Sequence, residues 1–322
     1  MRRGSIEADW LASRRGRADL GVFHEFAPPP SGGGHQFLRA LTRELAARGL
    51  EIEHNRLSRA TTACLFNSFN FDFERLRRFA RDGCRMVHRV DGPVGVYRGF
   101  DDGTDARVAE INRELATATV FQSRFSLDKH LELGYDLRDP VLIANAVDPS
   151  VFHPPARRDP LEGRKVRLIA TSWSANPRKG ADTFAWLDRN LDWSRYELTF
   201  VGQSPMTFDR ICTVGPVDSH GVADLLRGHD VFVAASEDDP ASNSLLEALA
   251  CGLPAVFRQS GGHPELVGGA GVPFLSHAEL SEALDHLVAE IDARRAAISI
   301  PSIASVADRY LEVLGLARPG TA

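Results

Sequence analysis

The chain has 322 residues, of which 43% are apolar and 25% are charged, and its net charge is -5. This length allows two domains of ordinary size, and the composition is typical of a soluble globular protein. The negative balance argues against a dedicated nucleic-acid partner, and no apolar run is long enough to span a membrane. The 4 cysteines are scattered without metal-ligand spacing, which indicates a reducing compartment and predicts a cytoplasmic location.

Residues 1–17 are polar and rich in arginine. They lack the apolar core of a signal peptide, so we expect a flexible N-terminal extension. A second interpretation is a weak peripheral contact between these arginines and an anionic membrane surface.

Strand-like and helix-like segments alternate from residue 18 to residue 152. A first strand is expected over 18–23, followed by a helix whose apolar residues recur at helical spacing and which ends near Gly49. Further short apolar segments alternate with helical ones up to residue 152. This alternation predicts a parallel sheet in an N-terminal Rossmann-like domain of the α/β class.

The glycine-rich segment Ser31-Gly32-Gly33-Gly34 lies between the first strand and the first helix. Without Cβ atoms, its backbone amides can approach a phosphate or a sugar; the alternative is a simple tight turn. A dinucleotide fingerprint requires a glycine where Phe37 stands, which argues against a nicotinamide cofactor.

His88 stands near the end of the expected strand 85–90. Residues at the carboxyl ends of parallel strands point into the ligand crevice. His88 is therefore a candidate to bind a sugar hydroxyl or to exchange a proton there. The alternative is a structural histidine that is held by Asp91.

A turn-rich segment, 153–164, predicts a linker between two domains. The strand and helix alternation then restarts and predicts a C-terminal Rossmann-like domain over 165–302. Residues 303–322 are expected to form a C-terminal helix that packs back on the N-terminal domain. Lys179 follows the first strand of the second half at a loop-to-helix junction, where it is placed to neutralise a phosphate; the alternative is a solvated surface lysine.

An acidic loop precedes a helix within residues 237–254. Ser242 and Asn243 can cap this helix with a side-chain oxygen. A strand, a loop and a helix N-terminus in succession form the place where open α/β sheets bind anionic ligands. Asp239 and Glu247 flank the free amides, which suits a ligand with both a phosphate and hydroxyls. The alternative is a pair of solvated acids on a surface helix.

Four segments in this order resemble the retaining glycosyltransferases of family 4, the group 1 glycosyltransferases. They are the glycine-rich segment 31–34, the hinge-like Asn-Ala-Val-Asp segment 145–154, the Lys-Gly loop 176–180, and the E-x7-E-like pair Asp239 and Glu247. The resemblance covers nearly the whole chain after residue 18. It implies the GT-B fold, in which two Rossmann-like parallel α/β domains face each other across a cleft. The N-terminal domain would hold the acceptor and the C-terminal domain the nucleotide-sugar donor.

The resemblance also implies roles for individual residues. Glu247 would bind the ribose hydroxyls, while three residues would act at the reaction centre, with His88 on the transferred sugar, Lys179 on the diphosphate and Asp239 facing the donor sugar. Five further residues would contact the donor nucleotide, namely Gly33, Gly34, Arg178, Val214 and Gly215. The donor-sugar loop would comprise Glu237, Pro240, Ala241, Ser242 and Asn243.

Two positions depart from the family's pattern. The first acid of the pair is usually Glu, and Asp239 is one methylene shorter, so Glu237 could take its role instead. Ser174 stands where the family usually has an arginine. Half of the phosphate clamp is therefore missing, unless Arg178 replaces it.

The implied reaction is the retaining transfer of a sugar from a nucleotide-diphosphate sugar to an unidentified hydroxyl acceptor, which could be a glycan, a lipid-linked or a small molecule. Polysaccharide biosynthesis is the expected setting. No Asp-x-Asp motif is present, so we expect a metal-independent reaction without a cofactor. The leaving diphosphate would be stabilised by Lys179, helix N-termini and glycine amides. One alternative is a catalytically lapsed GT-B subunit that binds nucleotides or sugars or serves as a scaffold, and another is a nucleotide-sugar epimerase.

Overall fold

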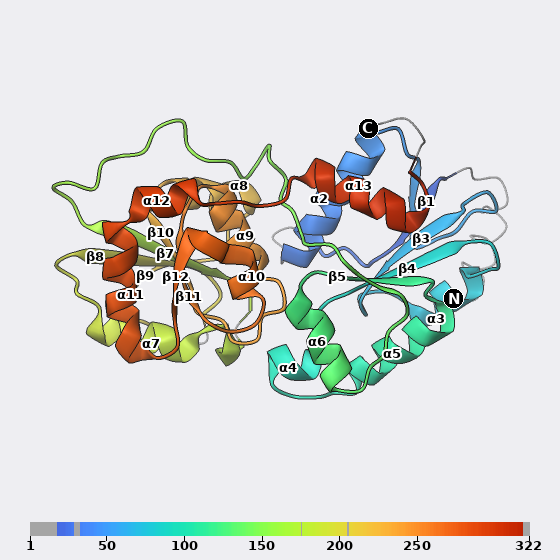
Figure 1. Ribbon diagram of the computed structural model, residues 1–322, viewed down its shortest axis with the longest axis horizontal. Helices are drawn as coiled ribbons and strands as arrows, with labels where there is room; N and C mark the ends of the chain where they lie inside the picture. The colour runs from blue at the N-terminus through green and yellow to red at the C-terminus, as the bar shows by residue number, and fades with distance from the viewer. Residues whose placement is uncertain (1–17, 29–32, 175, 205, 318–322) are drawn as a thin grey trace.

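The computed structural model describes residues 18–28, 33–174, 176–204 and 206–317. These residues form two lobes, each built on a six-stranded sheet whose strand pairs are all parallel (Figure 1). The extension predicted over residues 1–17, and Ser31 and Gly32 of the glycine-rich segment, lie outside the described residues.

The N-terminal lobe has the strand order β2-β1-β3-β4-β5-β6. Its strands are β1 (Leu20–Phe23), β2 (Ile52–His54), β3 (Ala63–Asn67), β4 (Arg85–Val90), β5 (Ala118–Phe121) and β6 (Pro140–Leu142). Its helices are α2 (Gly33–Ala47), α3 (Phe73–Phe79), α4 (Val94–Arg98), α5 (Thr104–Leu115) and α6 (Arg124–Glu132). The apolar face of α2, with Leu38 and Leu41 fully buried, packs on the sheet in one continuous core.

The C-terminal lobe has the strand order β12-β11-β10-β7-β8-β9. Its strands are β7 (Val166–Ser172), β8 (Tyr196–Gly202), β9 (Cys212–Val214), β10 (Val231–Ala234), β11 (Ala255–Arg258) and β12 (Gly271–Phe274). Its α-helices are α7 (Ala181–Asn190), α8 (Ser219–Arg227), α9 (Asn243–Ala250), α10 (His263–Val267), α11 (His277–Ala289) and α12 (Ile291–Ala296), and two 3-10 turns are η1 (Pro177–Lys179) and η2 (Gly268–Ala270). The order reverses between β7 and β10, and a doubly wound sheet binds its ligand where the order reverses.

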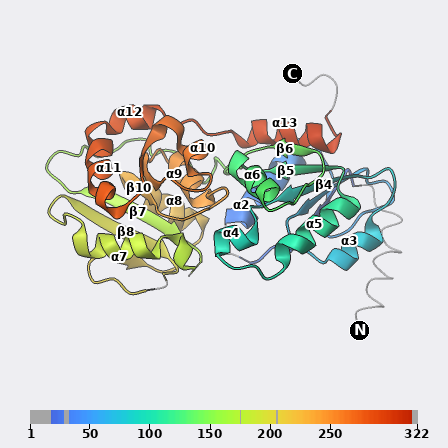
Figure 2. The same cartoon turned by 60° about the horizontal axis from the view of Figure 1, so that its bottom comes forward.

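The last helix, α13 (Ile303–Leu314), returns to the N-terminal lobe and lies beside α2 (Figures 1 and 2). Tyr310 is fully buried there, and its ring lies 6.1 Å from the ring of Phe37. The Arg85 side chain at the start of β4 donates to the backbone oxygen of Val313. The chain therefore crosses between the lobes twice, once after β6 and once before α13.

Polar contacts join the two lobes at helix ends. Glu265 of α10 accepts hydrogen bonds from the backbone amides of Arg124 and Phe125, each 2.8 Å long, at the start of α6. A carboxylate at this end of a helix is favoured by the partial positive charge of its free amides. Asn145, after β6, donates to Asn243 at the start of α9 over 2.9 Å.

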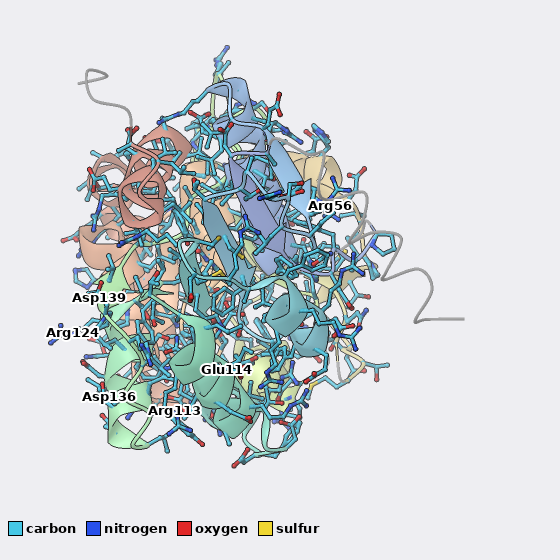
Figure 3. The ribbon with its side chains drawn as sticks, turned by 90° about the vertical axis from the view of Figure 1, so that its right-hand side faces the viewer. Arg56, Arg113, Glu114, Arg124, Asp136 and Asp139 are labelled. Atoms are coloured by element: carbon cyan, nitrogen blue, oxygen red, sulfur yellow. The ribbon has the colours of Figure 1, made fainter. Side chains whose placement is uncertain are left out.

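The outer end of the N-terminal lobe carries charges of both signs (Figure 3). Arg113 and Glu114 of α5 are exposed there, as is Asp136. This end of the lobe therefore does not present a surface of one charge sign. No helix among the described residues combines the length and the apolar character that a membrane crossing requires.

Asp230 anchors the start of β10 to the chain that enters the second lobe. Its buried carboxylate accepts two hydrogen bonds from Arg164, of 2.6 and 2.9 Å, and one of 2.9 Å from the amide of Arg167. Burial raises the pKa of Asp230, but the hydrogen bonds from Arg164 and Arg167 outweigh it and hold the pKa below its usual value. The ionised carboxylate therefore stabilises the native state.

Asp230→Ala should lower the free energy of unfolding by about 3 kcal/mol at pH 7, because it leaves the largely buried guanidinium of Arg164 without its carboxylate partner. A depressed carboxyl pKa stabilises above the unfolded-state value and loses that effect below it, so the difference should shrink as the pH falls below about 3.9. Urea unfolding from pH 7 to pH 3 measures both effects. Glu197→Ala is the control, because this exposed acid pairs loosely with Arg167. A loss that does not change with pH would contradict the assignment.

Candidate functional site

Two connected cavities lie between the lobes. The first, of about 230 Å³, opens where β7 and β10 end and is lined by residues 171–174 and 232–236. The second, of about 330 Å³, runs between α2 and α9 and is lined by both helices and by residues 218–220. Gly33 and Asn243 line both cavities. The two cavities therefore form one interlobe cleft at the switch point of the C-terminal sheet.

The amino ends of α2 and α9 meet in this cleft. Gly33 is the first residue of α2 and Asn243 is the first residue of α9. A Cβ atom on Gly33 would lie 2.3 Å from the Cβ of Asn243, so only glycine permits this approach. At Gly34, an added Cβ would meet no atom of the described residues within 4 Å. Two partial positive charges thus converge from opposite lobes, an arrangement that favours an anion between them.

Lys179 and Asp239 form an ion pair in the first cavity. The Lys179 ammonium lies 2.7 Å from a carboxylate oxygen of Asp239, which is buried, whereas Lys179 is partly exposed. Burial raises the pKa of Asp239, but the charges of Lys179 and His263 outweigh it and hold the pKa below its usual value. The cavity therefore presents a cation next to a fixed anion.

Ser236 and His263 form a hydrogen-bonded group with Asp239, and neither residue was predicted from the sequence to belong to the site. The Ser236 hydroxyl lies 3.1 Å from the Nε2 atom of fully buried His263 and 3.4 Å from Asp239. A Cβ on Gly261 would lie 2.3 Å from the backbone oxygen of Asp239. The glycine pair before His263 was the available signal, because it marks a close approach between two backbone segments.

Glu247 faces the second cavity from α9. Glu247 is only 6% exposed, and its carboxyl group has no hydrogen-bond or ionic partner among the described residues. Burial raises the pKa of Glu247 to about 8. Since buried polar groups are almost always paired, this carboxyl is placed to receive donors from a ligand.

The predicted donor-sugar loop, Pro240–Asn243, forms one wall of the first cavity. Ala241, Ser242 and Asn243 line it, and the amide of Ala241 donates to Asp239 over 3.3 Å. Ser242 caps α9 through its side-chain oxygen. Pro240 is buried and lies against Gly92 of the N-terminal lobe.

Asp239 and Glu237 were the two candidates for the first acid of the E-x7-E-like pair, and they lie in different surroundings. Asp239 lines the first cavity. Glu237 instead forms an ion pair of 2.7 Å with Arg258 and is absent from the lining of either cavity. The geometry therefore favours Asp239 as the acid that meets a ligand, and Glu237 as part of the surrounding scaffold.

Arg178 also points away from both cavities. It pairs with Asp238, and its side chain packs against Gly99 of the N-terminal lobe. Ser174 and Lys179 both line the first cavity. Arg178 is therefore not among the residues that line the first cavity with Ser174 and Lys179.

Val214 and Gly215 do not line the two cavities. Val214 ends the edge strand β9, where it pairs with Val201, and Gly215 is exposed beyond it. The residues that line the second cavity in this region are Asp218, Ser219 and His220 at the start of α8.

The role predicted for His88 has to be corrected. The residue lies inside β4, is 0% exposed and stacks on Phe66 at 4.3 Å. Its Nε2 atom lies 3.0 Å from the backbone oxygen of Ser68, and its Nδ1 atom lies 3.1 Å from the amide nitrogen of Asn112. Burial lowers the pKa of His88 to about 3. Both ring nitrogens are thus occupied inside the lobe, and the structural alternative holds, although Asp91 is not the partner.

The cleft therefore offers complementary sites for one composite ligand. An anion fits between the helix ends beside Lys179, and hydroxyl groups can donate to Glu247 on one side and to Asp239 on the other. Within the described ranges, no group of three or more His, Cys, Asp or Glu side chains could hold a metal ion.

The C-terminal lobe, which carries most of this cleft, resembles a known protein family. Residues 171–290 match the family model described as glycosyl transferases group 1, and they include Lys179, Asp239 and Glu247. No match was found among curated proteins.

Several solved structures share the fold over most of the chain. Sucrose-phosphate synthase from Thermosynechococcus elongatus has a TM-score of 0.68 at 16% identity, covering 92% of this chain and 95% of that one. Anabaena HepE in complex with UDP and glucose has a TM-score of 0.62 at 14% identity, with coverage of 92% and 95%. A UDP-forming trehalose-phosphate synthase from Burkholderia xenovorans has a TM-score of 0.59 at 15% identity, with coverage of 87% and 78%.

These likenesses confirm the predicted α/β architecture of two facing parallel sheets. The protein is a glycosyltransferase with the GT-B fold, and its C-terminal lobe carries the group 1 glycosyltransferase domain.

Proposed function

We propose that the protein is a retaining glycosyltransferase of family 4 that moves a sugar from a nucleotide-diphosphate sugar to a hydroxyl acceptor. The observation that carries this proposal is the set of three features in one cleft: converging helix N-termini, the Lys179 ammonium, and the unpartnered carboxyl of Glu247. Separately, each has an ordinary structural explanation. Together they match a ligand that has a diphosphate and a diol.

The donor would lie across both cavities. Its ribose would donate two hydroxyls to Glu247 in the second cavity, and its diphosphate would lie between Gly33 and Asn243, within reach of Lys179. Its sugar would then face Asp239 in the first cavity. HepE was solved with UDP and with UDP-glucose, which supports a nucleotide-sugar as the donor here.

The charges in the cleft suit the breaking of a glycosyl-phosphate bond. As the bond between the sugar carbon and the phosphate oxygen breaks, negative charge develops on the diphosphate and positive charge on the sugar. Lys179 and the two helix ends stabilise the first, and the ionised Asp239 stabilises the second. The acceptor hydroxyl would attack from the same face and pass its proton to the leaving phosphate. This scheme requires neither a metal ion nor a cofactor.

A second candidate function is a catalytically lapsed GT-B subunit that still binds nucleotides. Ser174 in the first cavity, together with the engagement of Arg178 by Asp238, motivates this alternative, because Lys179 is left without the usual neighbouring arginine. Release of UDP or GDP from the corresponding nucleotide-sugars, across a panel of hydroxyl acceptors, distinguishes the two. Nucleotide binding without release would favour the lapsed subunit.

Lys179→Ala should lower kcat by about 10²- to 10³-fold, the usual effect of removing one donor that stabilises developing negative charge. Steady-state release of the nucleoside diphosphate measures this effect. Arg178→Ala is the matched control, since it removes the neighbouring cation outside the cavities, and its effect should be at least about tenfold smaller. Equal losses in the two variants would remove the assignment of Lys179 to the diphosphate.

Nucleotide binding should release a proton below pH 8 and should tighten between pH 6 and pH 8. The carboxyl of Glu247, with its pKa raised to about 8 by burial, is mostly protonated at pH 7 in the free protein, whereas two ribose hydroxyls donate best to the carboxylate. Calorimetry in two buffers of different ionisation enthalpy counts the protons that are released.

Glu247→Gln should weaken UDP binding by about 10- to 100-fold at pH 8 and abolish the proton release, because it keeps the shape of the side chain but cannot ionise. His220→Asn is the control, because His220 lines the same cavity, and this variant should keep the pH dependence. Proton release that persists in Glu247→Gln and disappears in His220→Asn would move the assignment to His220.

A further inference from the structure

Arg89, near the end of β4, is a fully buried cation at the centre of the N-terminal lobe. It is 0% exposed, and its guanidinium donates to Asn67 over 2.6 Å, to Asp91 over 3.1 Å and to Asn145 over 2.9 Å. The ring of Phe37 lies 4.8 Å from its terminal carbon. A buried charge is tolerated only with such partners, so the surrounding side chains are held in fixed orientations.

The charge of Arg89 determines which way the Asn145 amide faces. A guanidinium has only donors, so Asn145 must turn its oxygen toward Arg89 and its NH2 group away. This NH2 group donates to the side-chain oxygen of Asn243 over 2.9 Å. The oxygen of Asn243 is therefore turned toward the N-terminal lobe, and its own NH2 group faces the other way.

The Asn243 NH2 group lies at the junction of the cleft. Its nitrogen is 3.0 Å from the position that a Cβ on Gly33 would take, where the ends of α2 and α9 meet. Asn243 lines the first and second cavities and also a third one, of about 170 Å³, which Asn145 lines as well. Among the described residues, the hydrogen bond that the Asn243 side chain forms is the one its oxygen accepts from Asn145.

We infer that Arg89 and Asn145 are positioning residues, which act through Asn243 to present an NH2 donor to the diphosphate of the donor substrate. This inference rests on the proposed function and adds a residue pair on the opposite lobe that completes the donor site. The polarity of the chain from Arg89 through Asn145 to Asn243 is fixed, because a guanidinium offers only hydrogen-bond donors. If the Asn243 amide were reversed, its oxygen would face the anion and repel it.

The arrangement also makes the site depend on the contact between the lobes. Arg89 and Asn145 belong to the N-terminal lobe, and Asn243 begins α9 in the C-terminal lobe. Separation of the lobes would break the hydrogen bond between the two asparagines, and the Asn243 amide could then rotate. The oriented donor is therefore available to the diphosphate only while the lobes are in contact.

Asn145→Asp tests the inference without a change of shape. The new carboxylate accepts from Arg89 but cannot donate to Asn243, so the Asn243 amide must turn its NH2 group toward residue 145 and its oxygen toward the cleft. The variant should keep the melting temperature or raise it, because a carboxylate next to a guanidinium is a stronger partner than an amide. Its affinity for UDP or GDP should fall by about 10- to 100-fold, while that for uridine or guanosine stays within about twofold.

Asn67→Asp is the matched control. It makes the same change at the other terminal nitrogen of the same guanidinium and adds the same charge, but Asn67 contacts Arg89 and His24 instead of Asn243. Its diphosphate affinity should stay within about threefold of the wild type. Asn243→Asp is a second variant, which places a carboxylate directly at the junction and should lose diphosphate binding. The variant should still fold, because a helix N-terminus favours an acidic residue.

Calorimetric titration of the three variants and the wild type with UDP, GDP and the two nucleosides gives separable outcomes. A selective loss of diphosphate affinity in Asn145→Asp and Asn243→Asp supports the inference. Equal losses in Asn145→Asp and Asn67→Asp, or no loss in Asn145→Asp, overturn it while the wild type still binds. Failure of the wild type to bind either diphosphate overturns the proposed function and this inference together.

Discussion

The contact between Gly33 and Asn243 is the constraint on which the cleft depends. It brings together the amino ends of α2 and α9, one from each lobe, at a distance that excludes any side chain on Gly33. The two partial positive charges repel each other at this short distance, and polar groups or an anion between them would offset the repulsion. Lys179 adds a full positive charge on one side of the same region, and the charge on Asp239 balances it.

The architecture was accessible from the sequence because it is encoded in local patterns. The helical spacing of Leu38 and Leu41 and the alternation of short apolar strands with helices both survive in the structure as a buried helix face and two parallel sheets. The residues that line the cleft could be located for the same reason, since Asp239 and Glu247 belong to one contiguous segment that joins a strand to a helix. A strand end and a helix start, read in order, place a side chain at the sheet edge without knowledge of the remainder of the fold.

What the sequence could not show depends on partners that are distant in the chain. His88 and Arg89 are neighbours at the end of one strand, and strand alternation alone does not say which of them faces a ligand. Their roles are decided by Asn112 for the histidine and by Asn145 for the arginine, which lie 24 and 56 residues away. Likewise, Glu237 forms an ion pair with Arg258 and Asp239 lines the first cavity, and no spacing rule predicts that ion pair.

The return of α13 to the N-terminal lobe has a mechanical consequence. The chain links the two lobes covalently at two crossings. A relative movement of the lobes is therefore least hindered when the distance that each crossing spans stays nearly constant. Sliding and twisting change the separation of one crossing or the other, whereas rotation about a line through both changes neither. Rotation about that line is therefore the relative movement that strains the two crossings least, and the packing of Tyr310 beside Phe37 joins the second crossing to the core of the N-terminal lobe.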